Sequence, residues 1–499
     1  MVERVRHVYV ISDMHLGGAY GTTPGDRGFR LNTHVPDLAA FVEAITRRAA
    51  NGESVELLIN GDMVDFLAER TPGSADWSPF TGNAVLAAEK FDALADRDTE
   101  FFEALGDLIA HEGRLIILLG NHDVELALPS VRRRLDARLR LAGPHGYTLV
   151  TNGEAYRVGD ALIEHGNDYD PFNLVNAESL RRICAFESRA ATLPDRDAFD
   201  VPAGSLMVSS VINPIKEEYR FIDLLKPENG AVVPVLLALE PGFRARLARV
   251  ADLSLRAERD ELRASDGPGA AALIAGEALN VVKDLERAGA AAARETVAVT
   301  SGLFHVIARA LGDSAGTFHA SVPAPVTPPA PMRQEAEALE ERIDRDVGLI
   351  RLLAANNHGQ IAQRMPALLT ALRGYQAGDA FSRNIETDAS FVRAATASIE
   401  NGFRYVLYGH THAAKQVPIG AGTYFNSGSW VDSMRVPADI LTGSPDAAMA
   451  ALQQFIAKVH AGDLSEWIEF EPTFVRLDVN DEGAVVDAAL VDYTGPEVV

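Results

Sequence analysis

The sequence has very little cysteine: one residue, Cys184, in a chain of 499. A single cysteine excludes an intrachain disulfide and a zinc site built from several thiolates. The surrounding letters RRICAFES are typical of a helix, and we interpret Cys184 as a small hydrophobic residue on its face. Scarce cysteine and the lack of a secretory signal pattern favour a reducing compartment, so we expect a cytoplasmic protein.

Long hydrophobic runs and an excess of positive charge are also missing. The longest apolar runs, such as residues 231–239, are far shorter than the roughly 20 residues of a membrane-spanning helix. Lys and Arg total 46 against 70 Asp and Glu, a net charge of −24. This disfavours a nucleic acid partner, which needs clustered basic residues. A small phosphorylated substrate stays possible, because bound cations can reverse the local potential.

The residues that are present alternate between strand and helix patterns at both ends of the chain. Hydrophobic residues make up 47% of the sequence, enough for a sizeable core. Continuous apolar strands separated by amphipathic helices indicate an α/β sheet covered by helices. Strand patterns occupy residues 6–12, 55–60, 114–120, 403–409, 473–479 and 484–491, and helix patterns residues 35–50 and 99–113.

The middle of the chain has a different pattern, rich in Ala, Arg, Glu and Leu. Apolar residues at helical spacing lie within 339–353, and a Pro-rich stretch at 321–331 resembles an extended linker. Such a long segment is not a structureless loop in a compact domain. We therefore predict a core in two parts, 1–171 and 403–499. Residues 172–402 form a mainly helical inserted subdomain, either a lid or an assembly element.

Polar residues of the types that can bind metals follow several strands of the predicted core. Because ligands in α/β sheets bind beyond the carboxyl ends of strands, we expect these side chains to converge. They are Asp13 and His15, Asp62 and Asp65, Asn121, His122 and Asp123, His165, and His410 and His412.

The spacing of these residues has a physical sense. Residues i and i+2 of an extended segment point to the same side, so Asp13 can converge with His15, and His410 with His412. Glycines 61, 120 and 409 would let the backbone turn sharply at the strand ends. Carboxylate, amide and imidazole donors suit Mn²⁺, Fe or Zn²⁺. The alternative for each short motif taken singly is ordinary turn or cap chemistry.

In this order the motifs resemble those of the calcineurin-like metallophosphoesterases. The chain has D13-M-H15, G61-D62-M-V-D65, G120-N121-H122-D123, H165 and G409-H410-T-H412. The resemblance covers about residues 1–170 and 403–499, and the opening ISDMHLGG is most similar to bacterial enzymes like UDP-diacylglucosamine pyrophosphohydrolase. It implies a four-layer αββα sandwich of two mixed sheets flanked by helices, interrupted by the large helical insertion.

The resemblance also implies a role for each residue. One metal would be held by Asp13, His15, Asp62 and His412, and a second by Asp62, Asn121, His165 and His410. His122 would protonate the leaving group, and Asp65 would orient His122. One departure is that Glu164, in place of a frequent glycine, precedes His165. We expect two divalent ions, Mn²⁺ first and Fe or Zn²⁺ as alternatives.

The implied activity is hydrolysis of a phosphoric ester. A hydroxide that bridges the two metals would attack phosphorus in line, and His122 would act as general acid. No serine-nucleophile elbow or P-loop motif competes with this interpretation.

The substrate stays open among three alternatives. The first is a phosphodiester or pyrophosphate, small or lipid-linked, beneath a lid. The second is a phosphomonoester, for which Arg27 and Arg30 could meet the extra charge. The third is a non-catalytic scaffold of the same fold, which the complete ligand set disfavours.

Two further segments each have two interpretations. The apolar residues 205–215, like 231–239, could line a lipid pocket or form ordinary helical core. Asp168, Asp170 and Asn173 could contact the substrate or form a polar turn before Pro171. No residue is assigned to substrate binding, and the oligomeric state is not predicted.

Overall fold

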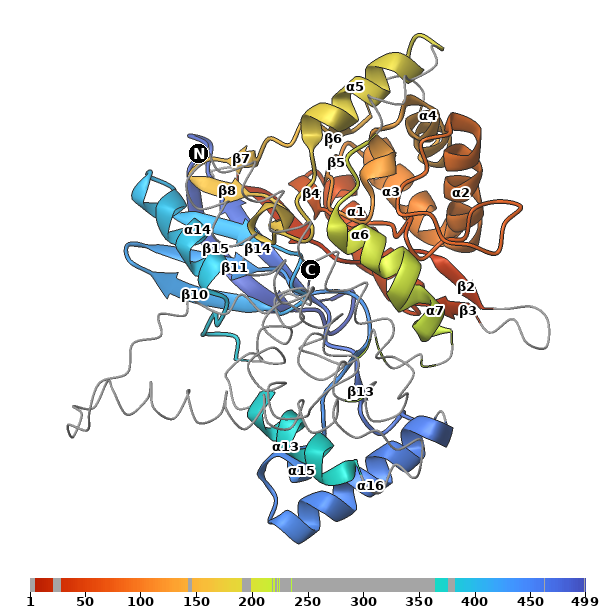
Figure 1. Cartoon of the computed structure of the whole chain (residues 1–499). Helices are drawn as coiled ribbons and strands as arrows, with labels where there is room; N and C mark the ends of the chain where they lie inside the picture. Colours follow the sequence, from red (N-terminus) through yellow and green to blue (C-terminus); the bar gives the residue numbers. More distant parts are fainter. Residues whose placement is uncertain are drawn as a thin grey trace, which may run out of the picture.

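The structure is a computed structural model of the whole chain (Figure 1). It describes residues 5–20, 28–141, 146–190, 199–217, 364–375, 382–461 and 463–497, and residues 219, 222, 224, 235 and 499. Most of the predicted insertion lies outside the described residues. So do Arg27, the Pro-rich stretch 321–331, the helix pattern at 339–353 and nearly all of the run 231–239.

A six-stranded mixed sheet carries the first three motifs. Its strand order is β15-β14-β1-β4-β5-β6. Strands β1, β4, β5 and β6 run parallel, and β14 and β15 are antiparallel additions. The predicted strands are confirmed, and their bounds are β1 Arg6–Ile11, β4 Ser54–Asn60, β5 Arg114–Leu118, β6 Thr148–Val150, β14 Thr473–Val479 and β15 Val485–Asp492.

A five-stranded mixed sheet carries the last two motifs, in the order β10-β11-β9-β8-β7. Its central strands β8 and β9 are parallel neighbours although about 240 residues of sequence separate them. The bounds are β7 Tyr156–Val158, β8 Ala161–Ile163, β9 Tyr405–Tyr408, β10 Lys415–Ile419 and β11 Gly422–Asn426. Two small hairpins lie outside these sheets: β2 Gly18–Tyr20 with β3 Gly28–Arg30, and β12 Ser433–Met434 with β13 Ile468–Glu469.

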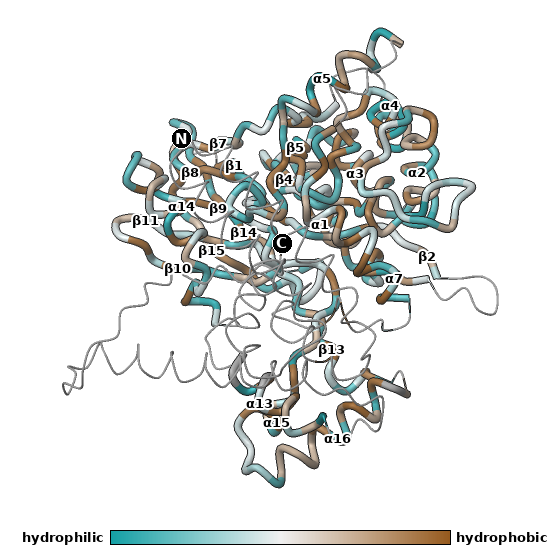
Figure 2. Tube along the Cα trace, viewed as in Figure 1, coloured by the Kyte–Doolittle hydropathy of each residue, from teal (hydrophilic) through white to brown (hydrophobic). Residues whose placement is uncertain are grey.

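The two sheets pack face to face with helices on both outer faces. In β1, Val8 and Val10 point into the hydrophobic layer between the sheets, which Ile163 and Leu407 enter from the other side. The alternating Tyr9 and Ile11 point outward, toward the helices that cover the first sheet. Hydrophobic residues run along the central strands β4 and β5 in Figure 2. The predicted αββα sandwich is confirmed.

Helices of the first core part and of the segment predicted as the insertion cover the sheets. The first sheet is covered by α1 Val35–Ala50, α2 Ala84–Arg97, α3 Thr99–Ala110 and α4 Pro129–Arg138. Helix α14, Ala389–Glu400, packs Phe391 and Ala395 onto the second sheet. Helix α5, Ala177–Glu187, carries a partly buried Cys184 whose Sγ donates to the carbonyl of Ala127 at 3.2 Å. This agrees with its interpretation as a small apolar residue.

A separate hydrophobic cluster joins helices from distant parts of the chain. Its helices are α6 Ala203–Met207, a π-helical turn Val208–Ile212, α7 Asn213–Lys216, α13 Met365–Tyr375, α15 Ala438–Thr442 and α16 Pro445–Ala461. Residues 205–215 are thus built into helical core, the second of their two interpretations, since Val211 and Ile215 are buried there. Helices α13, α15 and α16 lie together below the sheets in Figure 1. The domain boundaries stay a prediction.

Candidate metal centre

The five sequence motifs meet where β1, β4, β5, β8 and β9 end. Backbone hydrogen bonds tie the loops to one another: the amide of Asp13 donates to the carbonyl of Gly61 at 3.2 Å, and that of His15 to Asp62 at 3.0 Å. The amide of Gly409 donates to the carbonyl of His165 at 2.9 Å. The amide of His410 in turn donates to Asp13 Oδ2 at 3.0 Å, which joins the loops of the two sheets into a single framework for the polar side chains.

Most of the predicted metal ligands have left-handed backbone. The described residues contain eight non-glycine residues with positive φ, and five of them are Asp13, His15, Asp62, His410 and His412. Such backbone costs roughly 1–2 kcal/mol per residue and concentrates at functional sites. The expectation that Asp13 and His15 share an extended segment was therefore wrong, although their side chains do converge. Tight turns, not strand pleating, aim these ligands.

The first group of donors consists of Asp13, His15 and His412, whose ligand atoms lie within 4.8 Å of one another. His15 Nε2 is 3.0 Å from His412 Nε2, and His412 Nε2 is 3.4 Å from Asp13 Oδ1. The three side chains come from the two ends of the chain, and all are buried or nearly so. They could hold one metal ion.

The second group consists of Asp62, His165 and His410, again with ligand atoms within 4.8 Å. His165 Nε2 lies 3.2 Å from Asp62 Oδ2. Asn121, which is 2% exposed, lies in the loop after β5, and its Oδ1 has no hydrogen-bond partner among the described residues. His410 and His412 thus belong to different groups, as the resemblance implies.

Asp62 stands between the two groups. Its Oδ1 accepts a hydrogen bond from the amide of His122 at 2.9 Å. Its Oδ2 lies 3.6 Å from Nε2 of His15 in the first group and 3.2 Å from Nε2 of His165 in the second. One carboxylate oxygen therefore faces donors of both groups.

The glycines at the strand ends make room for these ligands. A Cβ on Gly120 would stand 2.1 Å from Asp62 Oδ1, and one on Gly61 would stand 2.4 Å from His165 Nδ1. A Cβ on Gly409 would stand 2.7 Å from Asp13 Oδ2. Only Gly61 of the three has positive φ, so the expected sharp turn applies there. At the other two positions the need is close approach, not backbone rotation.

His122 and Asp65 form a third group together with His15. His122 Nδ1 lies 3.1 Å from Asp65 Oδ2, and His15 Nδ1 lies 3.2 Å from the same oxygen. Burial lowers the pKa of His122, but the Asp65 and Asp62 carboxylates outweigh it and raise that pKa to about 9. Asp65 therefore contacts both rings and favours the protonated form of His122.

The electrostatics of the centre call for positive charge between the carboxylates. Burial raises the pKa of Asp13, and the neighbouring Asp62 raises it further. Burial lowers the pKa of His165, but Asp62 and Asp13 outweigh burial and raise it to about 10. Burial also raises the pKa of Asp62, yet His165 and His122 hold it well below its usual range. The raised pKa values mean that protons bind at these side chains when no metal is bound. A metal cation would take the place of those protons.

The donor set fits divalent ions. His165 Nδ1 lies 2.7 Å from the carbonyl of Asn60, which can only accept, so the neutral ring keeps its lone pair on Nε2 toward Asp62. The buried Oδ1 of Asn121 has no hydrogen-bond partner among the described residues, and Nε2 of His15 lies 3.0 Å from Nε2 of His412; an amide oxygen and imidazole nitrogens are atoms that can ligate a cation. Oxygen and nitrogen donors without thiolates suit Mn²⁺, Fe or Zn²⁺.

Several residues that support the site were missed or only noted from the sequence. Asp123 accepts hydrogen bonds from the amides of Gly120 at 2.7 Å and Met63 at 2.8 Å, and so ties two ligand loops together. Ser12 donates to Asp13 Oδ2 and lies 2.7 Å from Ser427. In the sequence, Asp123 ends the third motif without an assigned role, and no local signal pairs Ser12 with a residue 415 positions away.

The departure at Glu164 leaves His165 in place. The carboxylate of Glu164 accepts a hydrogen bond from Tyr169 Oη at 2.6 Å, and its carbonyl accepts one from Asn60 Nδ2 at 2.8 Å. Of the two arginines considered for a monoester, Arg30 donates to Asp98 at 2.5 Å. Arg30 is therefore committed to an ion pair.

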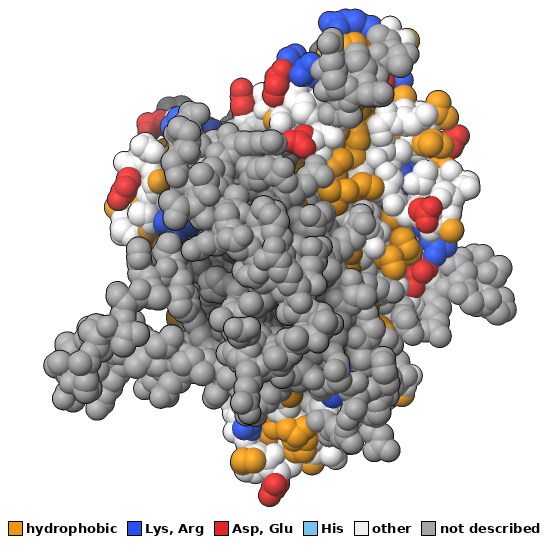
Figure 3. All heavy atoms as spheres, in the orientation of Figure 1, with side chains coloured by type: hydrophobic (Ala, Val, Ile, Leu, Met, Phe, Trp, Pro, Cys, Tyr) orange, Lys and Arg blue, Asp and Glu red, His pale blue; other side chains and the backbone are white. Residues whose placement is uncertain are grey.

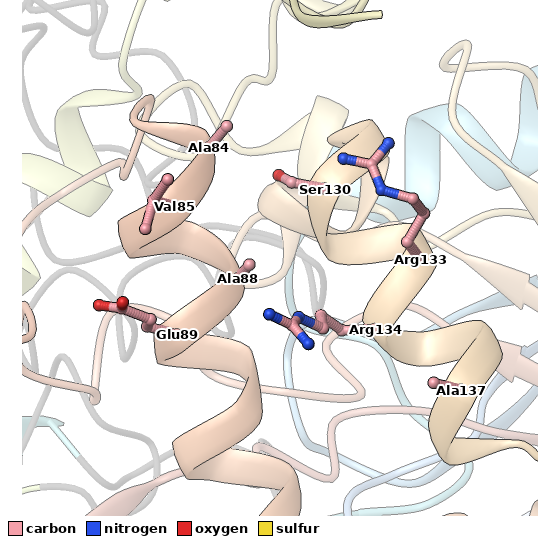
Figure 4. Close-up of a pocket in the computed structure, with 8 residues that line it drawn as sticks. All are labelled: Ala84, Val85, Ala88, Glu89, Ser130, Arg133, Arg134 and Ala137. Atoms are coloured by element: carbon pink, nitrogen blue, oxygen red, sulfur yellow. The ribbon is translucent and has the colours of Figure 1, made fainter.

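Two surface features lie apart from this centre. A hollow between α2 and α4 is lined by Ala84, Val85, Ala88, Glu89, Ser130, Arg133, Arg134 and Ala137, and none of the predicted ligands lines it (Figure 4). On the face drawn in Figure 3, the described Lys and Arg side chains are interspersed with Asp and Glu. Within the described residues, no helix is long and apolar enough to cross a membrane.

Comparison with known proteins gives one match. Residues 6–200 match the family model of the calcineurin-like phosphoesterases, which covers the first four motifs. No curated protein and no solved structure matches the chain. The match confirms the family resemblance over this part, and leaves the likeness to one branch of the family as a prediction.

Proposed function

Residues 6–200 of the chain match the family model of the calcineurin-like phosphoesterases, and on this premise we propose a dinuclear metal-dependent hydrolase of phosphodiester or pyrophosphate bonds. The family indicates metal-dependent phosphoester hydrolysis in general. The number of metals, the bond cleaved and the residue roles are our proposals.

The position of Asp62 is the observation that carries the dinuclear proposal. Its Oδ2 faces donors of two groups, each of which has three His or Asp ligand atoms within 4.8 Å. Protein loaded with Mn²⁺ should hold about two ions per chain by elemental analysis. Asp62→Asn should weaken both ions, because it removes the charge of the one carboxylate that both share. Saturation near one ion would refute the dinuclear site.

The chain's own residues then divide the chemistry. Two bound ions would supply an activated water and offset the charge on the phosphoryl oxygens. His122 would give a proton to the departing oxygen. Asp65 holds the proton on His122 through the 3.1 Å contact and fixes its ring. Asp65 is buried, whereas 17% of the His122 side chain stays exposed, which leaves the ring accessible to a substrate.

The start of the insertion supports a lid beside the centre. Asn213 Nδ2 donates to the carbonyl of Leu67 at 2.7 Å, and Glu217 pairs with Arg70, so α7 is fastened just after Asp65. Lys216 on the same helix is 5% exposed, and its positive charge acts to lower the pKa of His122. We propose that Lys216 helps to bind the anionic substrate. Lys216→Met should raise KM for that substrate with little change in kcat.

The choice between a phosphomonoester and a phosphodiester substrate depends on the basic side chains available to bind the phosphate. With Arg30 paired to Asp98, a diester or pyrophosphate with a bulky group beneath the lid is favoured over a monoester. The substrate that carries this group would be a phosphorylated small molecule or a lipid-linked phosphate. A panel of nitrophenyl monoesters and diesters and of nucleoside-diphosphate conjugates, assayed with Mn²⁺, tests this. A monoester preference would refute it, and no turnover of any member by protein that holds two ions would favour the non-catalytic scaffold.

A further inference from the structure

The turn that follows His165 touches two predicted ligands of the second metal. It contains a short 3₁₀ helix, Asn167–Tyr169, and continues through Asp170 to Asn173. Asp170 Oδ2 lies 3.1 Å from His410 Nε2, and Asn173 Oδ1 accepts a hydrogen bond from Asn121 Nδ2 at 3.2 Å. Asn173 Nδ2 in turn donates to Asp170 Oδ2 at 2.7 Å. One hydrogen-bonded pair therefore connects His410, from the far end of the chain, with Asn121.

Each contact decides which atom of the ligand is offered to a metal. A carboxylate accepts only, so the contact with Asp170 places the His410 proton on Nε2 and leaves the lone pair on Nδ1. The bond from Asn121 Nδ2 to Asn173 fixes the amide orientation and leaves the buried Oδ1 of Asn121 without a hydrogen-bond partner among the described residues. Nδ1 of His410 and Oδ1 of Asn121 are thus left with lone pairs, and both are atom types that a divalent ion binds.

Asp170 is suited to this role because everything around it donates. Its Oδ1 accepts from the amide of Phe172 at 2.9 Å, and its Oδ2 faces the donors of Asn173 and His410. Burial raises the pKa of Asp170, but the ring nitrogen of His410 and the side-chain bond from Asn173 outweigh burial and lower that pKa. An asparagine at this position would turn an NH₂ group toward at least one of these donors.

Helix α6 of the insertion packs against the segment that carries Asp170 and Asn173. The amide of Gly204 donates to the carbonyl of Phe172 at 2.7 Å. A Cβ on Gly204 would stand 2.2 Å from Asn173 Oδ1, the atom that holds Asn121. Glycine therefore lets α6 rest directly on Asn173.

We propose that Asp170 and Asn173 are positioning residues that set the donor atoms of His410 and Asn121 for the second metal, and that α6 holds them through Gly204. The proposal rests on the proposed dinuclear centre. It differs from both interpretations that the sequence allows for this segment, a substrate contact or a passive polar turn. It also couples the insertion to one of the two metals.

The test is Mn²⁺ binding to the full-length chain by equilibrium dialysis with elemental analysis. The electron paramagnetic resonance spectrum supplies a second readout, since spin coupling needs both ions. Asp170→Asn and Asn173→Ala should weaken the second ion about 10–100-fold and abolish the coupled spectrum, while the first ion stays bound. Asp168→Asn is the matched control, because Asp168 is exposed and accepts from Asn167 Nδ2 at 3.1 Å, not from a ligand. Circular dichroism verifies that each variant is folded.

A double-mutant cycle separates positioning from general destabilisation. Gly204→Ala should weaken the second ion alone, because the new methyl group displaces Asn173. In the Asn173→Ala background the same change should have no further effect on metal binding. Two ions in the wild type with unchanged second-ion binding in the Asp170 and Asn173 variants would overturn the proposal, as would additive effects in the cycle. Fewer than two ions in the wild type would instead overturn the proposed dinuclear centre.

Discussion

Replacing Gly120 by alanine should empty the metal centre without removing any ligand. Gly120 lies at the end of β5 and carries no side chain, and its amide donates to Asp123. The only new atom is a methyl carbon, which would stand 2.1 Å from Asp62 Oδ1 and 2.7 Å from Asp62 Cγ. Since φ at Gly120 is not positive, alanine introduces no backbone strain of the left-handed kind there.

The size of the effect follows from these distances. Non-bonded carbon and oxygen atoms sit about 3.5 Å apart at contact, so Oδ1 of Asp62 must move away by roughly 1.4 Å. Metal sites tolerate changes of about 0.2 Å in their ligand distances. Asp62 is the residue that faces both groups of donors, so both ions should be affected. We expect a loss of Mn²⁺ affinity larger than the roughly 10–100-fold typical of an outer-shell change.

The assay is equilibrium dialysis against Mn²⁺ with elemental analysis, together with thermal unfolding in a chelator. Gly52→Ala is the control, because Gly52 has φ of +85° and open space around its Cα. That variant should lose about 1 kcal/mol of stability from backbone strain and still bind two ions. A Gly120→Ala chain that binds two ions with the wild-type affinity would refute the reasoning from close approach.

Three further changes test other parts of the structure. His122→Ala should keep both metals and lower turnover roughly 10²–10⁴-fold for alkyl leaving groups, and much less for nitrophenyl esters; equal losses would exclude a general acid. Asp65→Asn should lower turnover less but also weaken the first ion, since Asp65 contacts His15 at 3.2 Å; unchanged Mn²⁺ binding would contradict this. His34→Gln probes an ion pair away from the metals. Partial burial lowers the pKa of His34, but Asp432 at 2.7 Å outweighs it and raises the pKa. A raised histidine pKa stabilises the fold below about pH 6.5 and ceases to do so as pH rises through the folded value. Unfolding free energy should therefore fall by about 1 kcal/mol at pH 6 and little at pH 9, and an equal loss at both would refute the pair.

The sequence predicted the parts of the site that repeat a local pattern. Each ligand follows a strand whose apolar letters identify it, and parallel strands bring their carboxyl ends to one edge. That rule was enough to gather Asp13, Asp62 and Asn121 from the letters alone. It failed on the backbone, because the convergence of Asp13 with His15 comes from left-handed turns that the extended-strand rule does not contain.

The rest of the site depends on contacts between segments far apart in the chain. Asp170 meets His410 across 240 positions, and Asn173 meets Asn121 across 52. Read alone, NDYDPFN is a polar turn, since its letters satisfy turn chemistry whether or not a ligand lies nearby. Asp170 and Asn173 differ from an ordinary polar turn because their hydrogen-bond partners are predicted metal ligands. Only the folded chain brings those partners to them. The role of Gly204 also depends on a distant contact. In the sequence it is only a poor helix residue, but in the structure its missing side chain leaves room for Asn173.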